Sequence, residues 1–311
     1  MFSSKPVKTE RRNPRSRGLD RKSTLAILRL LNREDARVAR AVRRELPNVA
    51  RVVDVIVKAF GSGGRLLYVG AGTSGRLAVL DAAECPPTFG MPPRMVQAII
   101  AGGSKALRHA VEDAEDSAPD GARDLSRAGI SKRDVVVGIS AGGTTRYVLG
   151  AIRFARQRGA VTVGVTSNRD SPLARHAQIL IAPDTGPEAI AGSTRLKAGT
   201  AQKMILNLLS SAAMVRMGRV YDNWMVYVAL TNSKLRRRGV RIGAEATGVD
   251  APTAERALRQ SGYNLPAALV ILKAGSTARD ARRALASVNG NVRQAVALLR
   301  KTAARKRHRP V

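Results

Sequence analysis

The stretch RLLYVGAGTSGRLAVLDAAECPPTFG, residues 65–90, holds a complete strand–turn–helix unit. Its first part, RLLYVG (65–70), is a continuous apolar run, which predicts a strand that is covered on both faces. A turn with three glycines and two hydroxyl residues follows, and the apolar residues after it have helical spacing. We expect this helix over 74–84, because Pro86 disfavours helical geometry at the residue before it. A buried strand that leads through a glycine turn into a helix is typical of parallel α/β sheets.

The same alternation continues along the chain. Further apolar runs predict strands over 95–100, 134–140, 161–166 and 178–183. Helices are expected over 104–115, 145–158, 171–177 and 195–217. The fold class is therefore α/β, a doubly wound parallel five-stranded sheet with N-terminal helices and a small C-terminal helical domain. In such sheets, ligands bind outside the carboxyl ends of the strands.

Composition divides the chain into six expected segments. They are a flexible basic arm (1–17), an N-terminal helical segment (18–54), the sheet domain (55–218), a connecting segment (219–242), a two-repeat, UBA-like helical domain (243–300) and a disordered basic tail (301–311). The repeat is visible in ALRQSGYNLPAALVILK (257–273) and ALASVNGNVRQAVALLR (284–300), which align at an offset of 27. Two copies are too few for a solenoid, so we expect a small packing domain.

The formal net charge of +31 is concentrated at the two ends of the chain. Residues 1–50 carry 14 Lys/Arg against 5 Asp/Glu, and residues 234–311 carry 18 against 4. Aromatic residues make up only 3% of the chain, which leaves little surface on which bases could stack. We therefore interpret the charge as solvated surface that binds nucleic acid only non-specifically, if at all, and that attracts anionic substrates.

The composition also argues against several other classes of protein. No apolar run reaches the roughly 18 residues that span a bilayer, and the N-terminus lacks the apolar core of a signal peptide, so we expect a cytoplasmic protein without a membrane partner. The single cysteine, Cys85, excludes an internal disulfide. The three histidines are widely spaced in the sequence, so we expect no bound metal.

Two loops have the composition of a phosphate site. In GAGTSG (70–75), Thr73, Ser74 and the free N–H groups of the following helix can donate to an anion. The spacing also fits a dinucleotide fingerprint, but no acidic residue follows the next strand to hold a ribose. SAGGTTRY (140–147) repeats the design with Ser140, Thr144 and Thr145. Because both loops follow strands of one parallel sheet, we expect them to converge on one small phosphate ester rather than to be two ordinary turns.

Two groups of carboxylates are candidates for acid–base chemistry. Glu84 is expected at the end of the helix over 74–84, where the negative end of the helix dipole favours a protonated carboxyl group, as a general acid requires. HAVEDAED (109–116) places Glu112 and Glu115 on one face of the helix that we expect there. By position alone, an exposed surface is the better interpretation of both groups.

These motifs together resemble the N-acetylmuramic acid 6-phosphate etherase family, which carries a sugar isomerase (SIS) domain and is related to the glucokinase regulatory protein. The resemblance runs from about residue 9 to about 300 and rests on GAGTSGRLAVLDAAECPPTFG, AIIAGGSKALRHAVEDAED, GSTRLKAGTAQK (192–203) and TERRNPRSRGLDRKSTLAILRLLNRED. The stretch at 140–147 reads SAGGTTRY where the family usually reads SASGRTPY. Likewise, TNSKL (231–235) lacks the glutamate of the family's TNEKL.

The resemblance implies an enzyme that needs no cofactor. It would cleave the D-lactyl ether of N-acetylmuramic acid 6-phosphate to N-acetylglucosamine 6-phosphate and D-lactate. Deprotonation at C2, β-elimination at C3 and addition of water are the steps that the family implies. Its acid–base glutamates fall at Glu84 and Glu115, and the loops described above would hold the 6-phosphate through Thr73, Ser74, Ser140, Thr144 and Thr145.

Two other hypotheses remain open from the sequence. The altered loop at 140–147 favours a non-catalytic, sugar-phosphate-sensing SIS protein, whereas the two glutamates favour the enzyme. A nucleic-acid-associated protein rests on charge alone. We also expect a homodimer, because the helix over 195–217 has a wide apolar face formed by Ala198, Ala201, Met204, Ile205, Leu208 and Leu209.

Overall fold

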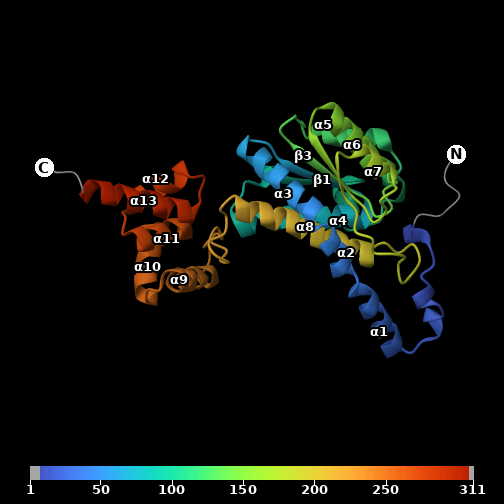
Figure 1. The fold of residues 1–311 in the computed structure, drawn as a ribbon, viewed down its shortest axis with the longest axis horizontal. Coiled ribbons are helices and arrows are strands. Elements are labelled where there is room, and N and C mark those ends of the chain that lie inside the picture. Colours follow the sequence, from blue (N-terminus) through green and yellow to red (C-terminus); the bar gives the residue numbers. More distant parts are fainter. Residues whose placement is uncertain (1–7, 308–311) are drawn as a thin grey trace. The chain divides into compact units, whose positions relative to one another are not determined.

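The computed structural model describes residues 8–307, and its centre is a parallel sheet of five strands (Figure 1). The strands are β1 (Leu66–Gly70), β2 (Val96–Ile100), β3 (Val135–Ile139), β4 (Val161–Val165) and β5 (Ile179–Ile181). Their order is β2-β1-β3-β4-β5, and every neighbouring pair is parallel. The expected doubly wound sheet is confirmed, with each strand at the place that its apolar run predicts.

Helices cover both faces of the sheet, which explains why the strands are apolar at every position. Figure 1 shows α5 (Ala118–Arg127), α6 (Arg146–Gln157) and α7 (Pro172–His176) on one face. The other face carries α3 (Leu46–Gly61), α4 (Gly72–Phe89) and α8 (Lys197–Arg216). Successive side chains of a strand point to opposite faces. Accordingly, Leu67 and Val69 of β1 pack in one cluster with α6, while Tyr68 points the other way and donates to Asp81 of α4 at 2.9 Å.

An ion pair joins the amino ends of β1 and β3, at the edge of the sheet opposite the carboxyl ends. The Arg65 Nη2 atom lies 2.9 Å from Asp134 Oδ2, and the Arg65 backbone N–H donates to Asp134 Oδ1 at 2.8 Å. Burial alone would raise the pKa of Asp134, but the hydrogen bonds from Arg65 outweigh it and hold that pKa below its ordinary value. The two strands are therefore clamped where they begin.

The N-terminal segment is packed from Lys8 onward, where a flexible arm had been expected. It forms three short 3₁₀ turns (Lys8–Glu10, Pro14–Ser16 and Leu19–Arg21) before α1 (Thr24–Asp35) and α2 (Val38–Arg44). Thr9 and Asn13 are buried, and Asn13 Nδ2 donates to Glu34 Oε2 of α1 at 2.8 Å. A buried polar side chain with a partner in α1 gives this charged segment a fixed place. Residues 1–7 lie outside the described range.

Two of the expected helices differ from the structure. Helix α4 does not end near Glu84 but continues through Pro86 and Pro87 to Phe89, and the Gly90 N–H donates to the Pro86 carbonyl at 2.9 Å. A proline removes only its own N–H bond to the carbonyl four residues earlier, so the last turn can still form. Glu84 is therefore not at the helix end, and the dipole argument for its protonation loses its premise.

The helix expected over 104–115 is also wrong. Two 3₁₀ turns, Gly103–Leu107 and Glu112–Glu115, stand in its place, and α5 follows at 118–127. Gly102 and Gly103 have φ values of 81° and 63°, and the extended backbone of Val111 interrupts any helix. Ser117 then caps α5, whose first turn contains a proline.

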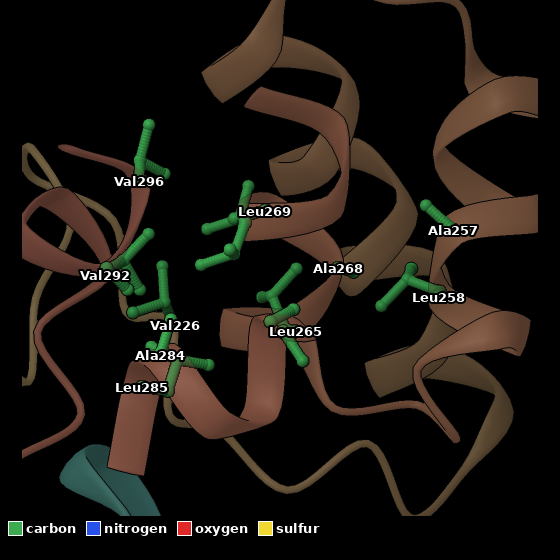
Figure 2. Packing of buried hydrophobic residues seen from close by; sticks show 14 of the residues in the cluster. Val226, Ala257, Leu258, Leu265, Ala268, Leu269, Ala284, Leu285, Val292 and Val296 are labelled. Atoms are coloured by element: carbon green, nitrogen blue, oxygen red, sulfur yellow. The ribbon is translucent and has the colours of Figure 1, made fainter. Parts of the chain in front are cut away.

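By its internal contacts the chain divides into two units. The first comprises the residues up to Ala83 and Pro92–Ala212, and the second comprises Glu84–Met91 and the residues from Ala213 onward. The second unit contains α9 (Ser233–Thr247), α10 (Ala251–Gln260), α11 (Leu265–Ala274), α12 (Ala278–Ser287) and α13 (Val292–Arg307). Figure 2 shows its core, in which Leu258, Leu265, Leu269, Leu285 and Val292 interlock. Helix α13 thus reaches into the range expected as a disordered tail, of which residues 308–311 are not described.

The two sequence repeats have the same turn geometry. Gly262 and Tyr263 both have left-handed φ values, 67° and 60°, and so do the aligned Asn289 and Gly290, 53° and 85°. In each copy an asparagine follows and caps the next helix, Asn264 through the Ala267 N–H and Asn291 through the Gln294 N–H. Among the described residues, no helix is long and apolar enough to cross a membrane.

Candidate active site

The strand order places a topological switch point between β1 and β3. From β1 the chain crosses to β2 on one side, and β3 lies on the other side of β1. Such a switch point is where open α/β sheets bind ligands. The loops 70–75 and 140–145 leave the sheet at this point, so the two hydroxyl-rich loops are neighbours, as expected.

In the first loop, Gly72 has a φ of 52° and opens α4 directly, so Thr73 and Ser74 lie in the first helical turn. Thr73 is half-buried, and Ser74 is buried. The Ser74 hydroxyl donates to Gln202 Oε1 of α8 at 2.9 Å. The Gln202 Nε2 group is buried without a hydrogen-bond partner in the described part of the chain. Helix α8 thus brings a further polar group to the start of α4.

In the second loop, two of the expected hydroxyls contact each other. Ser140 Oγ lies 2.9 Å from Thr145 Oγ1, and the Gly143 N–H donates to Ser140 Oγ at 3.1 Å. Thr144 is exposed and Thr145 half-buried, and α6 begins at the next residue. Gly143 has a φ of 72°, and a Cβ atom there would lie 2.2 Å from Ser171 Oγ. Only glycine fits this position.

Glu115 lies at a pocket of about 240 Å³ beside the first loop. The pocket is lined by Ala71 and Gly72 after β1, by Ala101 after β2, by Arg76 of α4 and by residues near Glu115. Glu115 is exposed at the end of its 3₁₀ turn. The Glu115 carboxylate and the backbone of the glycine turn therefore line one pocket at the carboxyl ends of β1 and β2.

Glu84 has a different place in the structure. It is exposed on α4 and is the first residue of the segment Glu84–Met91, which belongs to the second unit. Glu84 and Glu115 are therefore carried by different units of the chain. The local sequence at Glu84 does leave two helix carbonyls, those of Ala82 and Ala83, without their usual donors, because the nitrogen atoms four residues later belong to Pro86 and Pro87.

Sequence reasoning missed a third hydroxyl-rich loop, which follows β4. Thr166 Oγ1 donates to the Ala141 carbonyl at 3.0 Å, and the Ser167 N–H donates to the same carbonyl at 2.9 Å. Ser171 is buried against Gly143 and caps α7. This third loop therefore packs against the second one and holds it through hydrogen bonds to the Ala141 carbonyl. The signal was present in the sequence, since SNRDS (167–171) directly follows the strand run at 161–166.

A buried ionic network was also missed, although its lysine lies in the KAGTAQK stretch. Lys197 Nζ donates to Glu34 Oε2 at 2.6 Å and to the Pro187 carbonyl at 2.7 Å. Burial would raise the pKa of Glu34, but hydrogen bonds from Lys197 and Asn13 hold it below its ordinary value. The Glu188 carboxylate caps α8 through the backbone N–H groups of Lys197 and Ala198 at 3.0 and 2.8 Å, and burial raises its pKa. The network fixes the start of α8 and with it Gln202.

The described residues hold no group of three His, Cys, Asp or Glu side chains that could bind a metal ion. The polar groups described at this edge are hydroxyls, backbone N–H groups, Arg76 and the Glu115 carboxylate.

Comparison with known proteins shows which family the chain belongs to. The glucokinase regulatory protein N-terminal SIS domain matches residues 48–156, and the SIS domain matches residues 114–212. A protein from Edwardsiella ictaluri (strain 93-146) named N-acetylmuramic acid 6-phosphate etherase is 54% identical over 288 residues, which cover 93% of this chain and 96% of the relative. The chain belongs to the N-acetylmuramic acid 6-phosphate etherase family.

Other relatives are similar over the same length. The N-acetylmuramic acid 6-phosphate etherase of Serratia proteamaculans (strain 568) is 50% identical and covers 93% of this chain and 97% of its own. Among solved structures, a phosphoheptose isomerase from Francisella tularensis has a TM-score of 0.46 at 18% identity, covering 63% of this chain and 97% of that one. A phosphoheptose isomerase from Neisseria gonorrhoeae has a TM-score of 0.45 at 15% identity, covering 61% and 98%.

Proposed function

We propose that this member of the etherase family cleaves the D-lactyl ether of N-acetylmuramic acid 6-phosphate, giving N-acetylglucosamine 6-phosphate and D-lactate. The observation that carries the proposal is the 54% identity to a named etherase over nearly the whole of both chains. Two features of the structure support the proposal: the hydroxyl-rich loops that follow the neighbouring strands β1 and β3, and the pocket that contains Glu115.

The 6-phosphate is proposed to bind across the loops after β1 and β3. Thr73, Ser74, Ser140, Thr144 and Thr145 supply hydroxyls there. The first turns of α4 and α6 add backbone N–H groups, which favour an anion at a helix N-terminus. The contact between Ser140 and Thr145 supports this assignment, since it gathers two hydroxyls at one point of the loop.

The elimination is proposed to use the two glutamates in separate roles. Glu115 takes the proton from C2, the electron pair forms the C2–C3 double bond, and the C3–oxygen bond breaks as Glu84 protonates the departing lactyl oxygen. Water then adds to C3 of the unsaturated sugar. An ether is a poor leaving group, so the protonation is essential. The exposure of Glu84 on α4 supports its role as the acid, because its carboxyl group is open to a ligand.

The test is to incubate the purified protein with N-acetylmuramic acid 6-phosphate in D₂O and to measure both D-lactate and deuterium at C2. Glu84→Gln should abolish lactate release while some C2 exchange continues. Glu115→Gln should lose both, and Asp113→Asn, a change at an exposed acid of the same 3₁₀ turn, should lose neither. Lactate release at the wild-type rate by Glu84→Gln would disprove its role. No lactate from the wild-type protein would disprove the proposed function.

We further propose a homodimer that works in the cytoplasm. Phosphorylated sugars do not cross membranes unaided, so the enzyme belongs in the compartment where its substrate is phosphorylated. The expected dimer face of α8 is unsuitable, because Ala198, Ala201, Ile205 and Leu209 are fully buried within the chain itself. Exposed apolar side chains instead occur on α1, at Leu25 and Leu28, and these support an interface there.

A further inference from the structure

Arg76 is a half-buried cation on the second turn of α4, and the mechanism above does not use it. Its Nε–H donates to the Ala106 carbonyl at 2.9 Å, and its Nη2 donates to the His109 carbonyl at 3.1 Å. These bonds fix the guanidinium group on the loop that leads to Glu115. A guanidinium group has five N–H donors, so three are left for another partner.

The charge of Arg76 meets no counter-charge among the side chains that the structure describes. These are the side chains of residues 8–304 other than Glu112, and none of the ion pairs among them involves Arg76. Arg76 lines the pocket that contains Glu115, and it is the only cation among the described residues that do so. A fixed cation with free donors in a small pocket is suited to a planar anion, and a carboxylate matches the guanidinium fork best.

The position of the pocket indicates which anion this is. Neighbouring strands lie about 4.8 Å apart, so the loops after β3 and β2, with β1 between them, are separated by roughly 10 Å. N-acetylmuramic acid 6-phosphate carries its phosphate on C6 and its lactyl group on C3, at well-separated positions of the sugar ring. With the phosphate on the loops after β1 and β3, the ring lies over β1, and the lactyl group extends towards the β2 side, where the pocket lies.

We infer that Arg76 binds the carboxylate of the D-lactyl group and so distinguishes N-acetylmuramic acid 6-phosphate from sugar phosphates that lack this ether. The inference rests on the proposed function, since it assumes that substrate. It assigns Arg76 to substrate recognition and not to proton transfer. It also explains how a carboxylate substrate is tolerated beside Glu115, because a positive guanidinium group lines the same pocket.

The experiment compares two ligands, N-acetylmuramic acid 6-phosphate and N-acetylglucosamine 6-phosphate, by titration calorimetry. All proteins carry Glu115→Gln, so that the first ligand is not consumed. The parent should bind the lactyl ligand more tightly. Arg76→Gln should weaken that binding about 10- to 100-fold, as expected for charge-assisted hydrogen bonds, and change binding of the second ligand less than about threefold. Arg76→Lys should recover only part of the loss, and Arg108→Gln, at an exposed arginine of the same loop, should change neither.

Two results would overturn the inference. Equal weakening of both ligands by Arg76→Gln would mean that Arg76 only fixes the loop through Ala106 and His109. Equal affinity of the parent for the two ligands would mean that the lactyl carboxylate is not recognised at all. Either result is distinct from failure of the proposed function, which appears as the absence of D-lactate release by the wild-type protein.

Discussion

At the scale of single residues, Gly143 shows how closely the loop after β3 is fitted to its neighbours. Its backbone has a φ of 72°, and a methyl group there would meet Ser171 Oγ at 2.2 Å. Gly129 is a natural comparison, because its φ of 62° is similar but nothing lies within 4 Å of an added Cβ atom. Substitution at Gly129 therefore measures the destabilisation caused by the left-handed backbone alone, whereas substitution at Gly143 adds the clash with Ser171.

We therefore expect Gly129→Ala and Gly143→Ala to behave differently. Both should lower the free energy of unfolding by about 1–2 kcal/mol through the left-handed backbone. Only Gly143→Ala should also raise the KM for the sugar phosphate, because the clash with Ser171 displaces the N–H that donates to Ser140. Denaturant unfolding and steady-state kinetics measure the two effects. An unchanged KM for Gly143→Ala would argue against a phosphate at this loop.

The candidate residues could be found from the sequence wherever a motif follows a strand. Ser74, Ser140 and Thr145 follow apolar runs, and the parallel sheet brings their loops together without further information. Glu34, Lys197 and Gln202 could not be found in this way. Their contacts join residues more than 100 positions apart in the sequence, and a buried lysine cannot be distinguished from an exposed one by its local pattern.

At the scale of elements, α8 is held by the ionic network at its first residue. The pKa of Glu34 is held below its ordinary value of 4.5. Glu34 therefore contributes stability above that pH and loses it as the pH falls through the lowered pKa. Its partner Lys197 is buried as well, so each charge depends on the other.

Lys197→Met should lower the free energy of unfolding by about 3–5 kcal/mol at pH 7, because it leaves the buried Glu34 carboxylate with only the exposed Arg15, 3.6 Å away, as a counter-charge. The deficit should shrink as the pH falls towards 4.5, since the carboxylate can then take up a proton. Lys8→Met, which removes a partly exposed ion pair with Asp184, should cost no more than about 1 kcal/mol. Denaturant unfolding across this pH range is the measurement. A deficit that does not depend on pH would contradict the assignment to Glu34.

The end of α4 and the helix expected over 104–115 were predicted wrongly for the same reason, because both predictions used local preferences alone. Pro86 and the carboxylate-rich run 109–116 were interpreted from local preference. In the structure, α4 keeps its last turn through the Gly90–Pro86 bond, and the extended backbone at Val111 interrupts the expected helix. Preferences of about 1 kcal/mol per residue are outweighed easily by a closing hydrogen bond or by one residue held in an extended conformation. The strands were predicted reliably because a strand that is buried on both faces is apolar at every position, which is visible as a continuous apolar run in the sequence.

At the scale of the whole molecule, the proposed homodimer needs an apolar surface that a single copy leaves exposed. Of the six apolar residues expected to form it on α8, Ala198, Ala201, Ile205 and Leu209 are buried in the chain's own core, whereas Leu25 and Leu28 of α1 are more than half exposed. Sedimentation velocity at micromolar concentration should therefore show a dimer for the wild-type protein and a monomer for Leu25→Glu/Leu28→Glu. Leu298→Glu, at an exposed leucine of α13, should leave the dimer intact. A monomeric wild-type protein, or a dimeric double variant, would reject the interface on α1.

The clamp between Arg65 and Asp134 has a consequence for how this protein can change over evolutionary time. It holds β1 and β3 together at their amino ends, which lie at the opposite edge of the sheet from the candidate site. Loops at the opposite edge can then accept substitutions without endangering the scaffold. The unusual SAGGTTRY sequence is the kind of drift that such an arrangement tolerates. A library that randomises residues 142 and 144–146, while leaving Gly143 and the clamp untouched, should therefore yield mostly folded proteins with altered ligand preference.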